Sequence, residues 1–322
     1  MRYLIRRLVL FVAALFGLSL LVFVALRILP GDVASVMAGT NATPARVAAL
    51  RSQMGLDRSY PQQYADWLSG LMHGNMGVSA ISGRSVSSQV GSHAAITMPL
   101  IVLSLIVALG VGVPLGCQAV LAANSRVRGV LHTLAIVGGA VPALWGGLLL
   151  IMLFGRGVGL VGILPSQGFP DAGWRNPVAA LASLILPAIA TGLVAGAAIM
   201  RYTRACLISM EDSDAVAMAM ACGMTRRQAM LGVGLRLSAA QLVSVAGLTF
   251  AQMVTGVMVV ESLFNLPGLG AMLIGDVGNR DLVAVQSELF LLAAFFLLLG
   301  VLVDMLHHAL DPRLGGQSEE RG

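Results

Sequence analysis

The sequence contains no lysine, and all 20 of its basic residues are arginine. A phosphate-binding loop of the Walker A type needs a lysine that reaches the β- and γ-phosphates of the nucleotide. This absence excludes such a nucleotide site on the chain. Cysteine is also scarce: Cys117, Cys206 and Cys222 form neither a CxxC pair nor a cluster with histidine. We therefore interpret them as buried or inert thiols.

Charged residues of either sign are also scarce. Only 11% of the residues are charged, whereas about 25% is usual for a soluble domain, and 57% are hydrophobic. Six apolar runs are each longer than the roughly 20 residues that a helix needs to cross a bilayer. They are Leu8–Leu29, Ile96–Ala123, Val130–Phe154, Pro177–Met200, Leu237–Val260 and Leu282–Val303. The sequence therefore predicts an all-α membrane protein with about six transmembrane helices.

The first run could instead belong to a signal peptide, because Arg2, Arg6 and Arg7 precede it. A signal peptide has an apolar region of about 7–15 residues, and this run is about 22 residues long. Five further spans follow it. We therefore favour a retained N-terminal transmembrane helix over residues 1–29.

Arginine is distributed unevenly between the loops, which indicates orientation through the positive-inside rule. With a cytoplasmic N-terminus, the two short outside loops hold only Arg156, Arg175 and Arg280, while the inside segments hold most of the others. We predict that both termini are cytoplasmic. Residues 30–95 then form an external segment with short helices, residues 96–310 form a core of five helices, and residues 311–322 form a cytoplasmic tail. The net charge of +5 is explained by this topology and gives no evidence for nucleic-acid binding.

The predicted cytoplasmic loop 204–236 carries two helix signals. Asp212, Ser213 and Asp214 are candidate N-caps for a short helix over Ala215–Cys222, and Gly223 stands where a glycine would end it. Thr225 and Gln228 have the spacing of a capping box that opens a second helix. A short helix with small residues is suited to docking in a groove of another protein. An ordinary surface helix is the alternative.

Several motifs, in order along nearly the whole chain, resemble the permeases of binding-protein-dependent ABC importers of the dipeptide, oligopeptide and nickel branch. The most specific motif is Glu261–Gly270, which reads ESLFNLPGLG. Position 75 departs from the family pattern, since family members usually have aspartate where this chain has Asn75. The other matching motifs are Arg6–Leu8, Pro30–Asp32, Gly55–Asp57 with Gln63–Tyr64, Gly74–Ser79, Arg280–Asp281, Asp304 and Asp311–Arg313.

The resemblance implies a type I ABC importer permease fold in which the cytoplasmic loop is the coupling segment that docks on an ATPase. The implied coupling residues are Asp214, Ala215, Ala219, Ala221, Gly223, Met224 and Arg226. Ala215, Met220 and Cys222 replace a tyrosine and two basic residues of the family pattern, and Gln241 stands where a proline often follows. The docking surface should therefore be more apolar than usual. For the substrate path or a binding-protein contact, the candidates are Arg201, Glu261, Asn265 and Asp281.

The implied partners are a second permease subunit, two ABC ATPase subunits, an extracytoplasmic solute-binding protein and the lipid bilayer of the inner membrane. ATP and magnesium would bind to the ATPase subunits, and this chain would hold no cofactor, metal or catalytic residue. Short peptides are the expected substrate, and nickel chelates, glutathione or another small solute are the alternative. Arg201 could attract an anionic substrate group, gate the path or mark the membrane boundary.

Two other protein classes fit less well. A secondary transporter would carry ionisable residues at mid-membrane, but only His132 and Glu288 are candidates, and both lie within about two turns of a predicted helix end. An intramembrane enzyme would need a catalytic motif, and the five histidines are scattered without one. The 17 methionines are read as apolar filler and not as a metal path.

Overall fold

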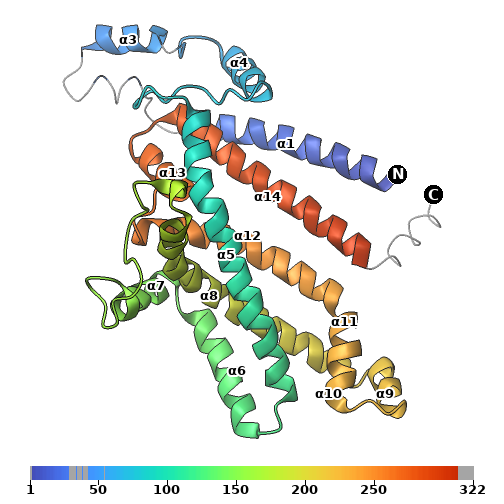
Figure 1. Cartoon of the computed structure of the whole chain (residues 1–322). Helices are drawn as coiled ribbons and strands as arrows, with labels where there is room; N and C mark the ends of the chain where they lie inside the picture. Colours follow the sequence, from blue (N-terminus) through green and yellow to red (C-terminus); the bar gives the residue numbers. More distant parts are fainter. Residues whose placement is uncertain (1, 29–33, 35–37, 39–42, 54, 311–322) are drawn as a thin grey trace. The chain divides into compact units, whose positions relative to one another are not determined.

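The computed structural model describes residues 2–28, 34, 38, 43–53 and 55–310, and the part of the chain so described is helical without any β-strand (Figure 1). It divides into two compact units, Met1–Thr97 with Pro267–Val301, and Met98–Leu266 with Leu302–Gly322. The predicted turn at residues 30–32, the tail 311–322 and the motif at residues 311–313 lie outside the described residues.

The first unit contains α1 (Arg2–Ile28), α3 (Pro44–Gln53), α4 (Tyr60–Met72), the start of α5 (Val86–Leu121), α13 (Leu269–Gly278) and most of α14 (Leu282–Leu310). Its core includes Val22 and Leu26 of α1 against Val285 of α14. Aromatic residues of α4 bond to both of these helices. The Tyr64 hydroxyl lies 2.7 Å from Ser19 Oγ, and Trp67 Nε1 donates to Ser287 Oγ at 3.2 Å.

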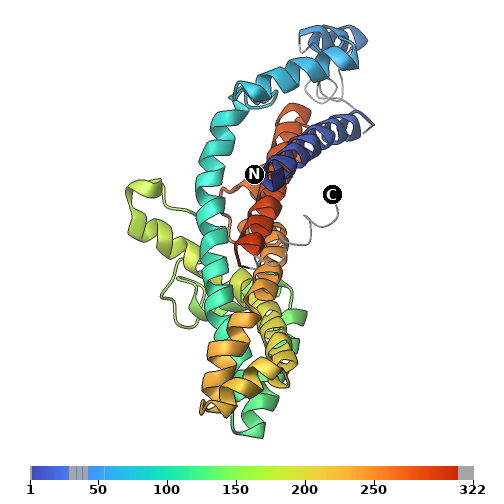
Figure 2. The same cartoon turned by 90° about the vertical axis from the view of Figure 1, so that its right-hand side faces the viewer.

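The second unit is built around α8 (Pro177–Glu211), which packs against α6 (Ser125–Ala140), α7 (Ala143–Phe154) and α12 (Ala239–Leu263). The remainder of α5 belongs to this unit as well. Between α8 and α12 the chain forms α9 (Asp214–Ala221), α10 (Arg226–Ala229), the π-helical η2 (Met230–Gly234) and α11 (Leu235–Leu237). Figures 1 and 2 both place these short elements together at one end of α8 and α12.

Glycines allow α5 and α8 to approach each other closely. A Cβ atom on Gly112 would lie 2.6 Å from Gly196 O, and one on Gly192 would lie 2.8 Å from Ser104 O. Gly116 is as close to Thr203, with a Cβ distance of 2.6 Å. Each helix thus presents a glycine pair four residues apart, the arrangement that lets membrane helices pack backbone to backbone. Ser104 and Thr191 add a hydroxyl contact of 2.5 Å between the same helices.

In the part of the chain that the structure describes, five helices are long and apolar enough to span a membrane, and α6 with α7 makes a sixth only as a pair bent by 105°. The predicted continuous span Val130–Phe154 is therefore wrong in detail. Pro142 has no N–H for the helical ladder, and it disfavours helical geometry at Val141, whose ψ is 122°. The bend between α6 and α7 therefore follows from the Val141–Pro142 dipeptide.

Two predicted helix ends also need correction. Helix α5 begins at Val86, ten residues before the predicted Ile96, because the burial of Val86 and Val90 outweighs the weak helix propensity of the serine- and glycine-rich segment. Helix α8 continues past the predicted Met200 to Glu211. No glycine or proline interrupts it there, so the first eight residues of the predicted loop 204–236 are helical.

Candidate functional site

The predicted coupling segment folds as α9 with one buried and one exposed face. Ser213 is the N-cap, since its side chain accepts from Val216 N–H at 3.4 Å, and Asp214 lies in the first turn. Val216 and Ala219 are buried in a cluster with side chains of α5, α8, α10 and η2. Ala219 therefore anchors α9 to the body of its unit and is not part of the exposed face.

The exposed face of α9 and the turn after it is mostly apolar. Met218 is 71% exposed, and Met220 and Met224 are also exposed. The other predicted coupling residues are exposed as well: Asp214, Ala215, Ala221, Gly223 and Arg226. We use the name methionine face for these three exposed side chains of α9 and the turn after it, Met218, Met220 and Met224, which lie on more than one side of the short helix. Flexible thioether side chains can adapt to an apolar groove in a partner, which is a common use of methionine at protein surfaces.

Gly223 ends α9 as the sequence predicts. Its φ is +94°, a conformation that costs glycine no Cβ clash. Met224 N–H donates to Ala219 O at 3.1 Å, and Gly223 N–H donates to Met220 O at 3.0 Å. These two bonds are those of a Schellman motif. The turn is therefore closed by hydrogen bonds and requires a left-handed residue.

The next helix begins with the predicted capping box. Gln228 N–H donates to Thr225 Oγ1 at 3.3 Å, and Thr225 N–H donates to Gln228 Oε1 at 2.9 Å. Arg226 lies in its first turn, and its Nε donates to Glu211 at the end of α8, at 3.0 Å. Both partners are partly exposed, so this pair contributes at most about 1 kcal/mol. It nevertheless ties α10 to the end of α8.

The four residues predicted for a substrate path or partner contact have structural partners. Arg201 of α8 is exposed, and its Nη1 donates to Ala135 O of α6 at 2.8 Å. Gly139 of α6 leaves room for this guanidinium, since a Cβ there would lie 2.0 Å from Nη1. Arg201 thus braces α6 against α8.

Glu261 and Asn265 both lie at the C-terminal end of α12. Glu261 is fully buried, and its carbonyl accepts from Leu266 N–H at 2.9 Å. Asn265 has a φ of +50° and occupies the left-handed position of a second Schellman-type turn, which asparagine tolerates. In the other unit, Asp281 is buried and accepts from Ser79 Oγ at 2.7 Å, Ile81 N–H and Ala284 N–H. It therefore holds the first turn of α14.

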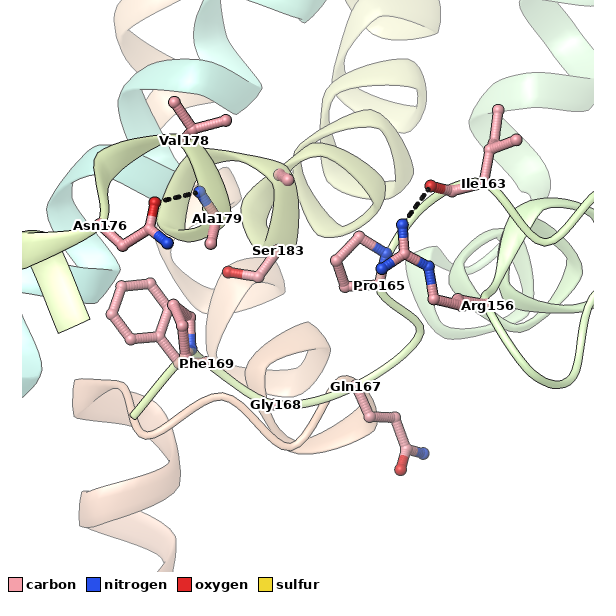
Figure 3. Close-up of a pocket in the computed structure, with 12 residues that line it drawn as sticks. Arg156, Ile163, Pro165, Gln167, Gly168, Phe169, Asn176, Val178, Ala179 and Ser183 are labelled. Carbon is pink, nitrogen blue, oxygen red and sulfur yellow. Dashed lines mark hydrogen bonds between the residues drawn. The ribbon is translucent and has the colours of Figure 1, made fainter. Parts of the chain in front are cut away.

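Sequence reasoning missed a pocket of about 450 Å³ beside the first turns of α8. It is bordered by Arg156 and by the segment before η1 (Gly173–Arg175), and that segment is tied to α12 by a bond from Gly168 N–H to Phe264 O at 2.8 Å. Figure 3 shows Arg156 and Asn176 on opposite sides of the pocket, with Ser183 between them. In sequence, Arg156 was visible only as one charge in a short loop.

Comparison with protein families identifies residues 108–316 as a binding-protein-dependent transport system inner membrane component, and residues 1–89 as the N-terminal part of such a component. The chain belongs to this family. It is an inner-membrane permease with several membrane-spanning helices.

Named relatives of this permease match over nearly their full length. The dipeptide transport system permease protein DppB of Escherichia coli strain K12 is 34% identical over 334 residues, 98% of each chain. The glutathione transport system permease protein GsiC of the same strain is 32% identical over 314 residues, 98% of this chain and 99% of the relative. A probable peptide ABC transporter permease protein, y4tP of Sinorhizobium fredii, is 31% identical and covers 97% and 98% of the two chains.

The fold of this permease is found in a solved structure too. A chain of the MetNI methionine ABC transporter in inward-facing conformations matches with a TM-score of 0.56 and 17% identity, over 70% of this chain and 97% of that chain. This likeness supports the type I ABC permease fold.

Proposed function

We propose that this permease moves short peptides into the cytoplasm by alternating access, driven by ATP hydrolysis on separate subunits. The observation that carries the substrate class is the 34% identity to a dipeptide permease over 98% of both chains. Glutathione is the second candidate, supported by the 32% identity to a glutathione permease. Glutathione is itself a small peptide, so both candidates share one chemistry.

The proposed energy transfer uses the exposed methionine face. Two ATPase subunits bind ATP and magnesium, and one of them receives α9 of this chain in an apolar groove. Because Val216 and Ala219 of α9 are buried against α5 and α8, a rigid displacement of α9 displaces the long helices with it. A second permease subunit completes the path, and an extracytoplasmic solute-binding protein delivers the peptide. This chain itself hydrolyses no ATP, consistent with its lack of the lysine that a Walker A loop needs.

Reconstitution with partner subunits tests this proposal. The chain alone should hydrolyse no ATP, whereas the complex with a second permease and two ATPases should hydrolyse ATP and take up a labelled dipeptide when the binding protein is present. Competition with unlabelled glutathione distinguishes the two candidates. Robust ATP hydrolysis by the isolated chain would refute the division of labour.

The proposed orientation, with both termini in the cytoplasm, is tested separately. An accessible tag near Gly129 should react only from the cytoplasmic side, and a tag near Ser82 only from the outside. A tag at Ser82 that is reachable only from the cytoplasm would overturn the proposed topology.

A further inference from the structure

Helix α7 and the loop after it form an arm that is almost free of charge. Between residues 143 and 170, Arg156 is the only charged side chain. Large apolar side chains of this arm are exposed on the helix, such as Trp145 and Met152, and on the loop, where Leu160 is 87% exposed. An exposed apolar surface of this kind marks contact with a membrane or another protein.

The loop is folded so that it satisfies the end of α7. The last four carbonyls of α7, from Ile151 to Phe154, accept from the N–H groups of Gly155, Leu160, Val161 and Leu164, at 2.8–3.1 Å. Water usually satisfies some of the four terminal carbonyls of a helix, and a helix end in lipid has no such water. Complete internal pairing therefore suits an arm that lies at the apolar edge of a bilayer. The close packing also needs glycine, since a Cβ on Gly159 would lie 2.6 Å from Gly155 N.

The single charge of this arm lies at the pocket. One nitrogen of the Arg156 guanidinium, Nη2, donates to Ile163 O at a long 3.4 Å (Figure 3). The remaining N–H groups of this guanidinium have no acceptor among the described residues. None of the described residues that line the pocket is acidic, and much of its wall is apolar, including Val178 and Ala182 of α8. The pocket thus lacks a counter-ion and offers a surface for hydrocarbon.

The position of the pocket limits its ligand. It lies at the first turns of α8, whose apolar sequence makes it a membrane span, so its height is that of the lipid headgroups. A helix N-terminus favours anions, and a guanidinium forms paired hydrogen bonds with phosphate oxygens. An ammonium headgroup would find no carboxylate among the lining residues. The combination fits a phosphate that carries acyl chains and no positive group.

We propose that the pocket between Arg156 and the first turns of α8 binds the headgroup phosphate of an anionic phospholipid. Arg156 holds the phosphate, and the apolar wall of α8 lies along the upper part of an acyl chain. The proposal depends on the membrane placement of α8 and is independent of which solute the permease carries.

Native mass spectrometry of the full-length chain in mild detergent tests the site. The chain is offered equal amounts of phosphatidylglycerol and phosphatidylcholine, and the lipid retained per chain is counted. We expect wild type to retain phosphatidylglycerol about fivefold more, the preference that one basic residue at a membrane surface provides. Arg156→Gln should abolish this preference, Arg156→Lys should keep part of it, and Arg175→Gln should keep it fully. Arg175 is a matched control, because it is exposed in the same loop but does not line the pocket.

Four results would overturn the proposal. Arg156→Gln with unchanged lipid retention and unchanged attachment of the solute-binding protein, or Arg175→Gln with an equal loss of retention, would show that the pocket has no specific role. Displacement of the lipid by millimolar inorganic phosphate would assign the site to a soluble anion. Unchanged lipid retention in Arg156→Gln with weaker attachment of the solute-binding protein would assign the pocket to an acidic side chain of that protein. Equal thermal unfolding temperatures of the variants establish that the fold is intact.

Discussion

Replacing Gly223 with valine tests whether the turn after α9 positions the methionine face. A Cβ at this residue would meet nothing within 4 Å, so the substitution causes no steric clash with a neighbour. The cost lies in the backbone, because a φ of +94° is rarely adopted by residues other than glycine. Such strain costs about 1–3 kcal/mol, towards the upper end for a β-branched residue.

The chain can avoid this strain only by giving up the Schellman turn. Changing φ to a negative value moves Met224 N–H away from Ala219 O and breaks that bond, whereas Gly223 N–H belongs to the preceding peptide and can keep its bond to Met220 O. The lost bond contributes about 1 kcal/mol, which is similar to the lower end of the strain. We therefore expect a mixture of strained and reshaped turns. Val216 and Ala219 remain buried, so α9 and the membrane helices should stay folded.

The assay combines abundance in the membrane, uptake of labelled dipeptide and ATP hydrolysis in the reconstituted complex. We expect Gly223→Val to insert normally, and to lose uptake while ATP hydrolysis no longer responds to substrate. Ala217→Val is the matched control, because this exposed residue lies inside α9 and valine there costs only about 0.5 kcal/mol. Gly223→Asn should be milder than valine, since asparagine tolerates positive φ. If Gly223→Val transports like wild type, the turn does not position a coupling surface.

Two further predictions concern stability. Gly116→Ala places a Cβ 2.6 Å from Thr203 Cβ and should lower the free energy of unfolding by about 1–3 kcal/mol, measured by thermal unfolding. In the control variant Gly110→Ala the new Cβ meets nothing within 4 Å, so this variant should unfold like wild type. Equal unfolding temperatures for the two variants would contradict the close packing of α5 and α8. Asp281→Ala removes the acceptor of Ser79 Oγ, Ile81 N–H and Ala284 N–H and should cost about 1–3 kcal/mol, while Asp281→Asn should cost less because asparagine also caps helices. An alanine variant as stable as the asparagine variant would show that these bonds contribute little.

The spans were predictable because membrane length and apolar composition are properties of a single segment. The turn at Gly223 was predictable for a similar reason, since a capped short helix followed by glycine is a local pattern. The break at Val141–Pro142 was not, because the residues on either side are equally apolar and proline is common in membrane helices.

Features that depend on contacts between helices were predicted from the sequence only in part or not at all. The glycine pairs Gly112/Gly116 and Gly192/Gly196 are readable as small-residue motifs, but their mutual pairing appears only in the structure. The inward orientation of Ala219 likewise depends on the cluster around it. Arg156 looked like a topology marker because only the folding of the loop back onto the first turns of α8 places its side chain at a pocket.

The length of α8 has a mechanical consequence. Its 35 residues, at about 1.5 Å each, make a rod of about 52 Å that has the lipid pocket at one end and α9 at the other. A tilt of about 10° about its midpoint displaces each end by roughly 4–5 Å, with the helix itself unchanged. A rigid helix of this length transmits a displacement of one end to the other end, across the membrane, without a series of side-chain rearrangements between them. A lipid bound in the pocket would contact the N-terminal end of α8, while α9 displaces its C-terminal end. The bound lipid would then change the free-energy cost of tilting α8.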